Sequence, residues 1–293
     1  MTGVAHGLGR TARPRQWLKN VLVFAAPGAA GVLSDWTDLG RTVLAFVAFC
    51  LAASGIYLWN DALDVDADRI HPTKRFRPVA AGIVPVATAK IVGTILAVLA
   101  PVVALFTGRW QAAAVVLVYV AVTLLYSSWL KHVAVIDIVT VAAGFVLRAA
   151  AGAAAVDVPM SNWFVLVTVF GSLFIVSGKR YAELRELGED AAAVRATLAD
   201  YTVDYLRIVV IVSCGAALVS YCQYAFERSE ETSADWPFYE LSIVPMLTAL
   251  LRYALVIEQG RGAAPEDVFA RDRVLQLLGV AWVVVFGLAV YVS

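Results

Sequence analysis

The residues best suited to chemistry lie in one short stretch, Asn60–Asp68, which reads NDALDVDAD and follows an uncharged apolar run. We call it the acidic motif. If it continues a helix at about 100° per residue, four oxygen-bearing side chains share an arc of about 100°, and Asp66 points roughly opposite. Carboxylate and amide oxygens are hard ligands that suit Mg²⁺ better than a soft metal. The pattern therefore predicts a magnesium site formed by Asn60, Asp61, Asp64 and Asp68.

A basic segment follows the acidic motif and predicts a phosphate-bearing ligand. Mg²⁺ keeps waters and shares its shell with substrate phosphates, so the array implies a diphosphate. Lys74, Arg75 and Arg77 would bind the remaining phosphate oxygens. The prolines at 72 and 78 are expected to break the helix and fold this segment back over the site. The alternative is a solvated helix end with mixed charges.

The composition of the chain is that of an integral membrane protein. Of 293 residues, 61% are hydrophobic and 16% charged, and the mean hydropathy is +0.77. A soluble domain cannot hide that much apolar surface. The formal net charge is zero, so no general attraction to nucleic acid is expected. The three cysteines lie in apolar runs without metal-ligand spacing and are interpreted as core residues.

Nine apolar windows have about the length that a membrane span needs, since roughly 20 helical residues cross the hydrocarbon core. Pro27 and glycines interrupt the first of them. Runs of this length that are rich in Leu, Ala and Val predict an all-α integral membrane protein with about nine transmembrane helices in one bundle. The windows lie near residues 17–33, 41–60, 84–106, 110–128, 134–155, 162–181, 206–226, 240–258 and 273–292.

The charges of the loops predict the orientation. The N-terminal segment is basic without an acidic residue, and every second loop after it is basic. The alternate loops, such as 34–38 and 227–235, are acidic or nearly uncharged. We therefore expect a cytoplasmic N-terminus and a multi-pass protein of the plasma membrane whose active site faces the cytoplasm. No linker marks a second domain, so residues 1–293 are predicted to form a single domain with large cytoplasmic loops near 61–83 and 179–207.

At the acidic motif the sequence resembles the UbiA-type intramembrane prenyltransferase superfamily, whose mark is N-D-x-x-D-x-x-x-D at the end of the second helix. Asn60, Asp61, Asp64 and Asp68 match this pattern residue by residue. RPRQWLKN at 13–20, YSSWLKHVAVID at 126–137 and SGKRYAEL at 177–184 are also similar to the family. The resemblance implies nine helices around a central cavity, with Mg²⁺ and a diphosphate at the cytoplasmic mouth.

One departure from the family pattern bears on the substrate. Typical members carry a second aspartate-rich motif after the sixth helix, which holds a second Mg²⁺ on a prenyl diphosphate. Here that place reads GKRYAELRE, led by Lys179 and Arg180. Together with HPTKRFRPVAAG at 71–82, the pattern is most similar to the decaprenyl-phosphate phosphoribosyltransferase branch.

The resemblance to that branch implies a reaction. It is Mg²⁺-dependent transfer of 5-phosphoribosyl from 5-phosphoribosyl-1-diphosphate to polyprenyl (decaprenyl) phosphate, with release of diphosphate. The product would serve as a lipid-linked arabinose precursor for cell-wall arabinan. Whether the protein forms a homo-oligomer is left open.

Other polar residues at or within the membrane are candidate substrate contacts, because a charge near a helix centre costs about 2.5–3.5 kcal/mol and needs a reason. Asp137 and Arg148 share a helix face but lie about 16 Å apart along the axis, too far for one ion pair within the helix. Arg148 could instead pair with another helix or extend outward to the interface. The remaining candidates are Lys19, Tyr126, Lys131, Lys179 and Arg180. For Tyr126, a structural role at the interface is an equal alternative.

Two rival functions remain open from the sequence. A cation-coupled transporter would use the acidic face to bind its ion, but transporters usually place such sites near the midplane between repeated halves. A prenyltransferase that uses a prenyl diphosphate donor and a small acceptor is the rival within the same superfamily.

Overall fold

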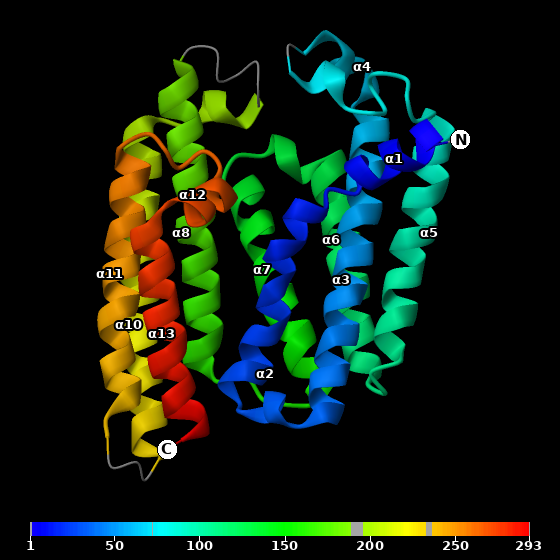
Figure 1. Ribbon diagram of the computed structural model, residues 1–293. Coiled ribbons are helices and arrows are strands. Elements are labelled where there is room, and N and C mark those ends of the chain that lie inside the picture. Colours follow the sequence, from blue (N-terminus) through cyan, green and yellow to red (C-terminus); the bar gives the residue numbers. More distant parts are fainter. Residues whose placement is uncertain (1, 72, 189–195, 233–235, 293) are drawn as a thin grey trace. The chain divides into compact units, whose positions relative to one another are not determined.

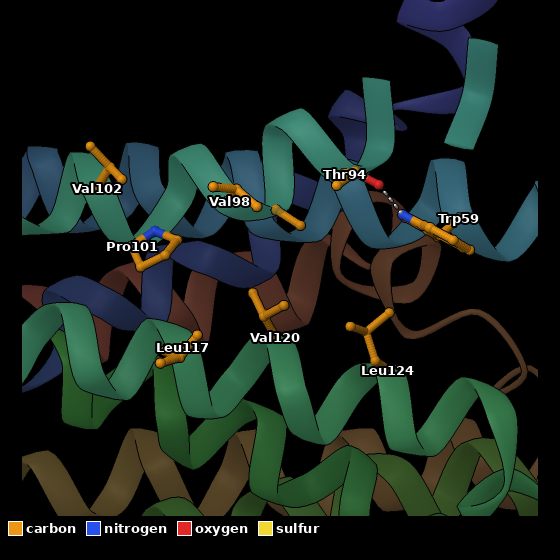
Figure 2. Close-up of a pocket in the computed structure, with 9 residues that line it drawn as sticks. Trp59, Thr94, Val98, Pro101, Val102, Leu117, Val120 and Leu124 are labelled. Carbon is orange, nitrogen blue, oxygen red and sulfur yellow. Dashed lines mark hydrogen bonds between the residues drawn. The ribbon is translucent and has the colours of Figure 1, made fainter. Parts of the chain in front are cut away.

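The computed structural model describes residues 2–71, 73–188, 196–232 and 236–292. These residues form helices joined by turns and contain no strand, which confirms the predicted all-α class (Figure 1). Eight of the helices in the described ranges are long and apolar enough to cross a membrane. They are α3 (Trp36–Leu63), α5 (Val86–Leu105), α6 (Trp110–Ser128), α7 (Ile136–Val156), α8 (Asn162–Leu187), α10 (Val203–Glu230), α11 (Phe238–Glu258) and α13 (Arg273–Tyr291).

Shorter helical pieces connect or precede the long helices. The α-helical ones are α1 (Thr2–Thr11), α2 (Ala25–Ala29), α4 (Val65–Ile70) and α12 (Pro265–Arg271). The 3₁₀ segments are η1 (Pro14–Phe24), η2 (Val32–Ser34), η3 (Lys74–Phe76), η4 (Leu130–His132) and η6 (Ala196–Asp200).

The first apolar window is not a single α-helix, and in this respect the expectation for residues 17–33 is wrong. The chain forms η1, then α2, then a left-handed turn at Gly31 with φ of 73°. Proline at position 27 removes a backbone donor, and the glycines of this segment lower its helix propensity. The result is a broken segment that runs beside α3 (Figure 1).

The predicted loop near 179–207 begins later than expected. Helix α8 continues through Lys179 and Arg180 and ends at Leu187, so both basic residues lie on a helix. Residues 189–195 lie outside the described ranges, and η6 follows them. The predicted loop at 61–83 likewise begins with helical residues, because α3 extends to Leu63.

Contacts within the described residues divide the chain into two compact units. Unit 1 comprises Met1–Ser128 and Leu147–Pro159, and unit 2 comprises Trp129–Val146 and Met160–Ser293. The boundary falls within α7, whose first half belongs to unit 2 and whose second half belongs to unit 1. The single domain expected from the sequence stays a prediction.

In unit 1, α3 and α5 approach closely at two glycines, and this contact positions the end of α3 that carries the acidic motif. A Cβ atom on Gly55 would lie 2.7 Å from the carbonyl oxygen of Gly93, and a Cβ on Gly93 would lie 2.9 Å from the carbonyl oxygen of Gly55. Small residues allow such backbone contact between membrane helices. The unit's core is built on side chains such as Phe49, Ala52 and Val116.

In unit 2, α8 packs against α10, and α11 packs against α13. The core includes Phe174, Tyr181 and Leu206, all nearly inaccessible to solvent. Polar residues just before the helices fix where they begin: Ser161 caps α8, Thr202 caps α10 and Asp272 caps α13 through hydrogen bonds from backbone amides.

Candidate active site

The acidic motif spans the end of α3 and the start of α4, and the helix is interrupted at Asp64. This residue has φ of −88° and ψ of 10°, so one continuous helix through Asp68 is not formed. The backbone amide of Asp64 still donates to the carbonyl of Asn60 at 2.9 Å, and that of Asp68 donates to Asp64 at 2.8 Å. These bonds carry the helical i, i+4 spacing across the interruption.

Burial separates the aspartates as the helical register predicts. Asp61 and Asp68 are only 2% and 3% exposed. The Asp66 side chain is 90% exposed, and within the described ranges it pairs with its exposed neighbour Arg69, at 3.2 Å. The outward position of Asp66 is therefore confirmed.

Arg77 folds back onto the acidic motif from the basic segment. Its Nη1 atom lies 2.7 Å from Asp68 Oδ2 and 3.3 Å from Asp61 Oδ1, so one nitrogen bridges two buried carboxylates.

The exposed Arg75 guanidinium lies over the ring of Phe76 at 4.8 Å, and Lys74 is half-buried on η3. Proline 72 lies outside the described residues, but α4 ends at Ile70 and His71 is extended, as a helix break there requires.

Arg13 is a functional candidate that the sequence reasoning missed. Its Nη2 atom lies 2.6 Å from Asp61 Oδ1, and its guanidinium carbon lies 4.9 Å from the centre of the Tyr57 ring. Arg13 is left-handed, with φ of 52° and ψ of 62°, a conformation that costs a non-glycine residue about 1–2 kcal/mol. The sequence marks the basic segment 13–20 only by its similarity to the family, because nothing in the spacing of that segment points to a carboxylate 48 residues away.

Magnesium fits the donor chemistry of the acidic motif. All its ligand atoms are oxygens, and the buried Oδ1 atom of Asn60 has no hydrogen-bond partner among the described residues. A buried oxygen without a donor is costly, and a cation would satisfy it. Within the described residues, no three His, Cys, Asp or Glu side chains are arranged to hold a metal by themselves. That is consistent with an ion that completes its shell with water and substrate phosphate.

A second polar cluster lies within unit 2 and joins two predicted substrate contacts. Asp137 is completely buried, and its Oδ2 lies 3.4 Å from Arg180 Nε. The hydroxyl of Tyr201 donates to Asp137 Oδ1 at 2.6 Å, and burial together with this bond raises the pKa of Tyr201. The same hydroxyl accepts from the backbone amide of Val135, which has φ of 69°. The cluster therefore ties the loop after Lys131 to α8 and to the segment after η6.

The two predicted cations of α8 share a carboxylate neighbour, Glu183. Arg180 Nη1 lies 2.8 Å from Glu183 Oε2, and Lys179 Nζ lies 3.7 Å from Glu183 Oε1. The latter contact is between partly exposed groups and contributes little to stability.

Arg148 is buried within unit 1, where it contacts other helices, as the alternative reading predicts. Its Nε donates to Asn20 Oδ1 at 2.8 Å and its Nη2 to the Tyr119 hydroxyl at 2.9 Å. The guanidinium also lies over the rings of Phe49 and Tyr119. Arg148 thus joins η1, α3, α6 and α7, and a substrate contact there stays a prediction.

The predicted site residues divide between the two units. The structure brings the acidic motif and Arg77 together in unit 1, with Lys19 half-buried on η1 and Tyr126 half-buried on α6. In unit 2 it brings Asp137 and Arg180 together, with Lys131 half-buried on η4 and Lys179 on α8.

Known proteins are similar to this chain in sequence and in fold. Decaprenyl-phosphate phosphoribosyltransferases of Mycolicibacterium smegmatis and Corynebacterium glutamicum are 47% and 46% identical to it. The matches cover 98% and 99% of this chain and 93% and 88% of those proteins. A solved UbiA homologue from Archaeoglobus fulgidus, bound to GPP and Mg²⁺, has a TM-score of 0.72 at 16% identity and covers 98% of this chain and 100% of that one.

The structural match shows the fold of the chain, and the sequence matches show the family to which it belongs. The model of the UbiA prenyltransferase family matches residues 21–277, which include the acidic motif and parts of both units. With its apolar helices, the chain is a multi-pass membrane protein. It belongs to the UbiA prenyltransferase family.

Proposed function

We propose that the chain is a Mg²⁺-dependent phosphoribosyltransferase. It transfers 5-phosphoribosyl from 5-phosphoribosyl-1-diphosphate to polyprenyl (decaprenyl) phosphate and releases diphosphate. The observation that carries this proposal is the 47% identity, over nearly the whole chain, to proteins named decaprenyl-phosphate phosphoribosyltransferase. The geometry of the acidic motif supports it, because buried carboxylates and a bridging arginine suit a metal-bound diphosphate.

Each part of the acidic motif has a proposed role toward the donor. Asp61, Asp64 and Asp68 would hold the metal together with the Oδ1 atom of Asn60, which has no hydrogen-bond partner in the part of the chain that the structure describes. Arg77 contacts two of these carboxylates and would bind diphosphate oxygens from the same position. When bound, Mg²⁺ would stabilise the negative charge on the departing diphosphate.

The replacement of the second aspartate-rich motif supports a sugar donor over a prenyl diphosphate. On α8, Glu183 lies near both Lys179 and Arg180, so the segment is a mixed-charge cluster rather than an acidic one. Cations near the membrane surface suit the other anionic groups of this reaction, which are the 5-phosphate of the donor and the phosphate of the lipid. We propose Lys19, Lys74, Arg75, Lys131, Lys179 and Arg180 for these groups, with Tyr126, Asp137 and Arg148 as further polar contacts.

The proposed reaction needs no strong general base. The nucleophile is an oxygen of polyprenyl phosphate, which is already anionic at neutral pH. None of the three histidines is buried, since His6 and His132 are exposed and His71 is half-exposed. Rate acceleration would come from positioning and from electrostatic stabilisation of an oxocarbenium-like ribose.

The proposed location follows from the distribution of loop charge. Basic loops favour the cytoplasmic side, and the loop that carries the acidic motif is one of them. We propose a plasma-membrane enzyme whose active site faces the cytoplasm, where a water-soluble sugar donor is accessible. Its product would supply lipid-linked arabinose for cell-wall arabinan.

We expect the purified protein to consume labelled 5-phosphoribosyl-1-diphosphate when Mg²⁺ and a polyprenyl phosphate are both present. Transfer of label to the lipid extract and release of diphosphate are the measurements. A parallel reaction with labelled prenyl diphosphate and small aromatic acceptors tests the rival prenyltransferase. Label that moves only in the parallel reaction would replace this proposal with the rival.

We further expect the transfer to invert the configuration at C1 of the ribose. Attack by the lipid phosphate from the face opposite the departing diphosphate converts an α-linked donor into a β-linked product. NMR of the purified lipid sugar measures the linkage. An α-linked product would exclude a single displacement and indicate a covalent carboxylate intermediate.

A further inference from the structure

The buried carboxylate of Asp61 has two arginine partners, which differ in how they are held. Arg77 bridges Asp61 and Asp68, so its position depends on two carboxylates. Arg13 contacts only Asp61 among the acidic residues of the motif, and its contact is the shorter, at 2.6 Å against 3.3 Å for Arg77. Asp61 is 2% exposed, so water screens these contacts only weakly.

Arg13 begins a segment that runs antiparallel along one face of α3. We call this segment, Arg13–Phe24, the N-terminal strap. Trp17 Nε1 donates to Ser54 Oγ at 3.1 Å, and Asn20 Nδ2 lies 3.3 Å from Cys50 Sγ. The partners on α3 fall at positions 50, 54 and 61, which share one helix face. These contacts therefore fix the position of Arg13 along the axis of α3, beside Asp61.

The strap is also unusual in its backbone. Residues Pro14–Phe24 form a 3₁₀ helix of 11 residues, whereas such helices rarely exceed three or four. Arg13 itself is left-handed, with φ of 52°. Backbone strain of this kind persists where surrounding contacts impose it, and it is often found at sites that switch. The ion pair with Asp61 is one contact that opposes relaxation of Arg13.

A divalent cation and the Arg13 guanidinium compete for Asp61. Mg²⁺ binds carboxylate oxygens at about 2.0–2.1 Å. A cation bound to Asp61 would stand close to the guanidinium that now lies 2.6 Å from Oδ1, and two positive charges at that separation repel each other. We therefore expect the Arg13–Asp61 pair to lengthen or break when metal binds.

We propose that Arg13 is a positioning residue that acts as a counter-ion for Asp61 before metal binds, and that metal binding releases it. The N-terminal strap is thereby coupled to metal occupancy of the acidic motif. This inference rests on the metal site of the proposed function and adds a residue that the motif itself does not contain.

The direct test is metal binding alone, without donor or lipid. Binding of Mn²⁺ to the full-length purified protein is followed by the loss of the free-ion electron paramagnetic resonance signal. Arg13→Gln removes the competing charge, and we expect its dissociation constant for Mn²⁺ to fall about fivefold or more. Arg13→Gly should show the same gain, because glycine accepts the left-handed conformation without strain. Arg13→Lys keeps a cation and should remain near wild type.

Arg69→Gln is the matched control, because Arg69 pairs with the outward-facing Asp66 and should leave metal affinity unchanged. A second readout is hydrogen exchange of backbone amides in residues 15–24. In the wild type, added Mn²⁺ should speed their exchange, and in Arg13→Gln the exchange should be fast with or without metal. Equal or weaker Mn²⁺ binding by both Arg13→Gln and Arg13→Gly would overturn the inference.

Asp61→Asn separates failure of this inference from failure of the metal site. If Asp61→Asn loses Mn²⁺ binding while the Arg13 variants gain none, the metal site stands and only the coupling to the strap falls. If Asp61→Asn binds Mn²⁺ like the wild type, the metal assignment on which the inference rests falls with it.

Discussion

Asp61→Asn and Asp64→Asn should each lower the rate of phosphoribosyl transfer at least about a hundredfold, as the loss of one electrostatic group at a reacting centre typically does. Asparagine keeps the size of aspartate but removes the negative charge that would bind the metal. Asp61 is buried, and its partners Arg13 and Arg77 have side chains that are 32% and 29% exposed, so these arginines can turn to water when the charge is lost. We therefore expect the loss of activity without loss of the fold.

The measurement is the initial rate over a Mg²⁺ titration, with circular dichroism to check that each variant is folded. Asp66→Asn is the control, because its side chain is 90% exposed and lies off the buried face. It should stay within about twofold of wild type, in keeping with the small effects of surface substitutions. Near-normal turnover of both Asp61→Asn and Asp64→Asn at low Mg²⁺ would remove the metal site from the mechanism. An equal loss in Asp66→Asn would contradict the division into buried and exposed aspartates.

Arg180→Ala should destabilise the protein by about 3–5 kcal/mol, since it leaves a buried carboxylate without its cation. The Arg180 side chain is 4% exposed, and its partner Asp137 is completely buried. Tyr201 and Thr197 would still donate to Asp137, but two neutral hydrogen bonds do not replace an ion pair. For a protein of this size, the unfolding midpoint in detergent should fall by roughly 10 °C.

Lys179→Ala is the matched control, because Lys179 precedes Arg180 on α8 and makes a long ion pair of 3.7 Å with Glu183, with both side chains partly exposed. It should shift the midpoint by no more than the roughly 1 kcal/mol of an exposed pair. The double variant Asp137→Leu with Arg180→Met removes both charges and should recover most of the lost stability. An unchanged midpoint in Arg180→Ala would contradict the structural role of this pair. Recovery of stability without recovery of activity in the double variant would assign Arg180 or Asp137 a direct contact with substrate as well.

For this membrane protein, the sequence alone was sufficient to predict the features that depend on a local pattern of residues. Long apolar runs can satisfy their backbone hydrogen bonds in lipid only as helices, so the all-α class followed from hydropathy. The outward position of Asp66 also followed from spacing, because a helical register is a local property. The return of Arg77 to the acidic motif was predicted from the prolines that flank the basic segment.

The same local reasoning failed where a different part of the chain determines the result. The window 17–33 has the hydropathy of a span but forms η1 and α2, stabilised by side-chain contacts with α3. Hydropathy counts apolar residues and does not register such contacts. The interruption at Asp64 was also missed, since the i, i+4 spacing of the motif is the same with or without it.

Sequence by itself determined that the chain is a helical membrane protein and which residues form its acidic motif. Tertiary structure decided the partners of those residues. The pairs Arg13–Asp61 and Arg180–Asp137 join residues 48 and 43 positions apart, and Arg148 meets Asn20 across 128 positions. Helical periodicity relates only residues a few turns apart on one element, so it carries no information about which charge of another element will face a given carboxylate. Helix packing sets those pairings, because a charge that leaves water is stable only where the surrounding helices place an opposite charge or a hydrogen-bond donor beside it.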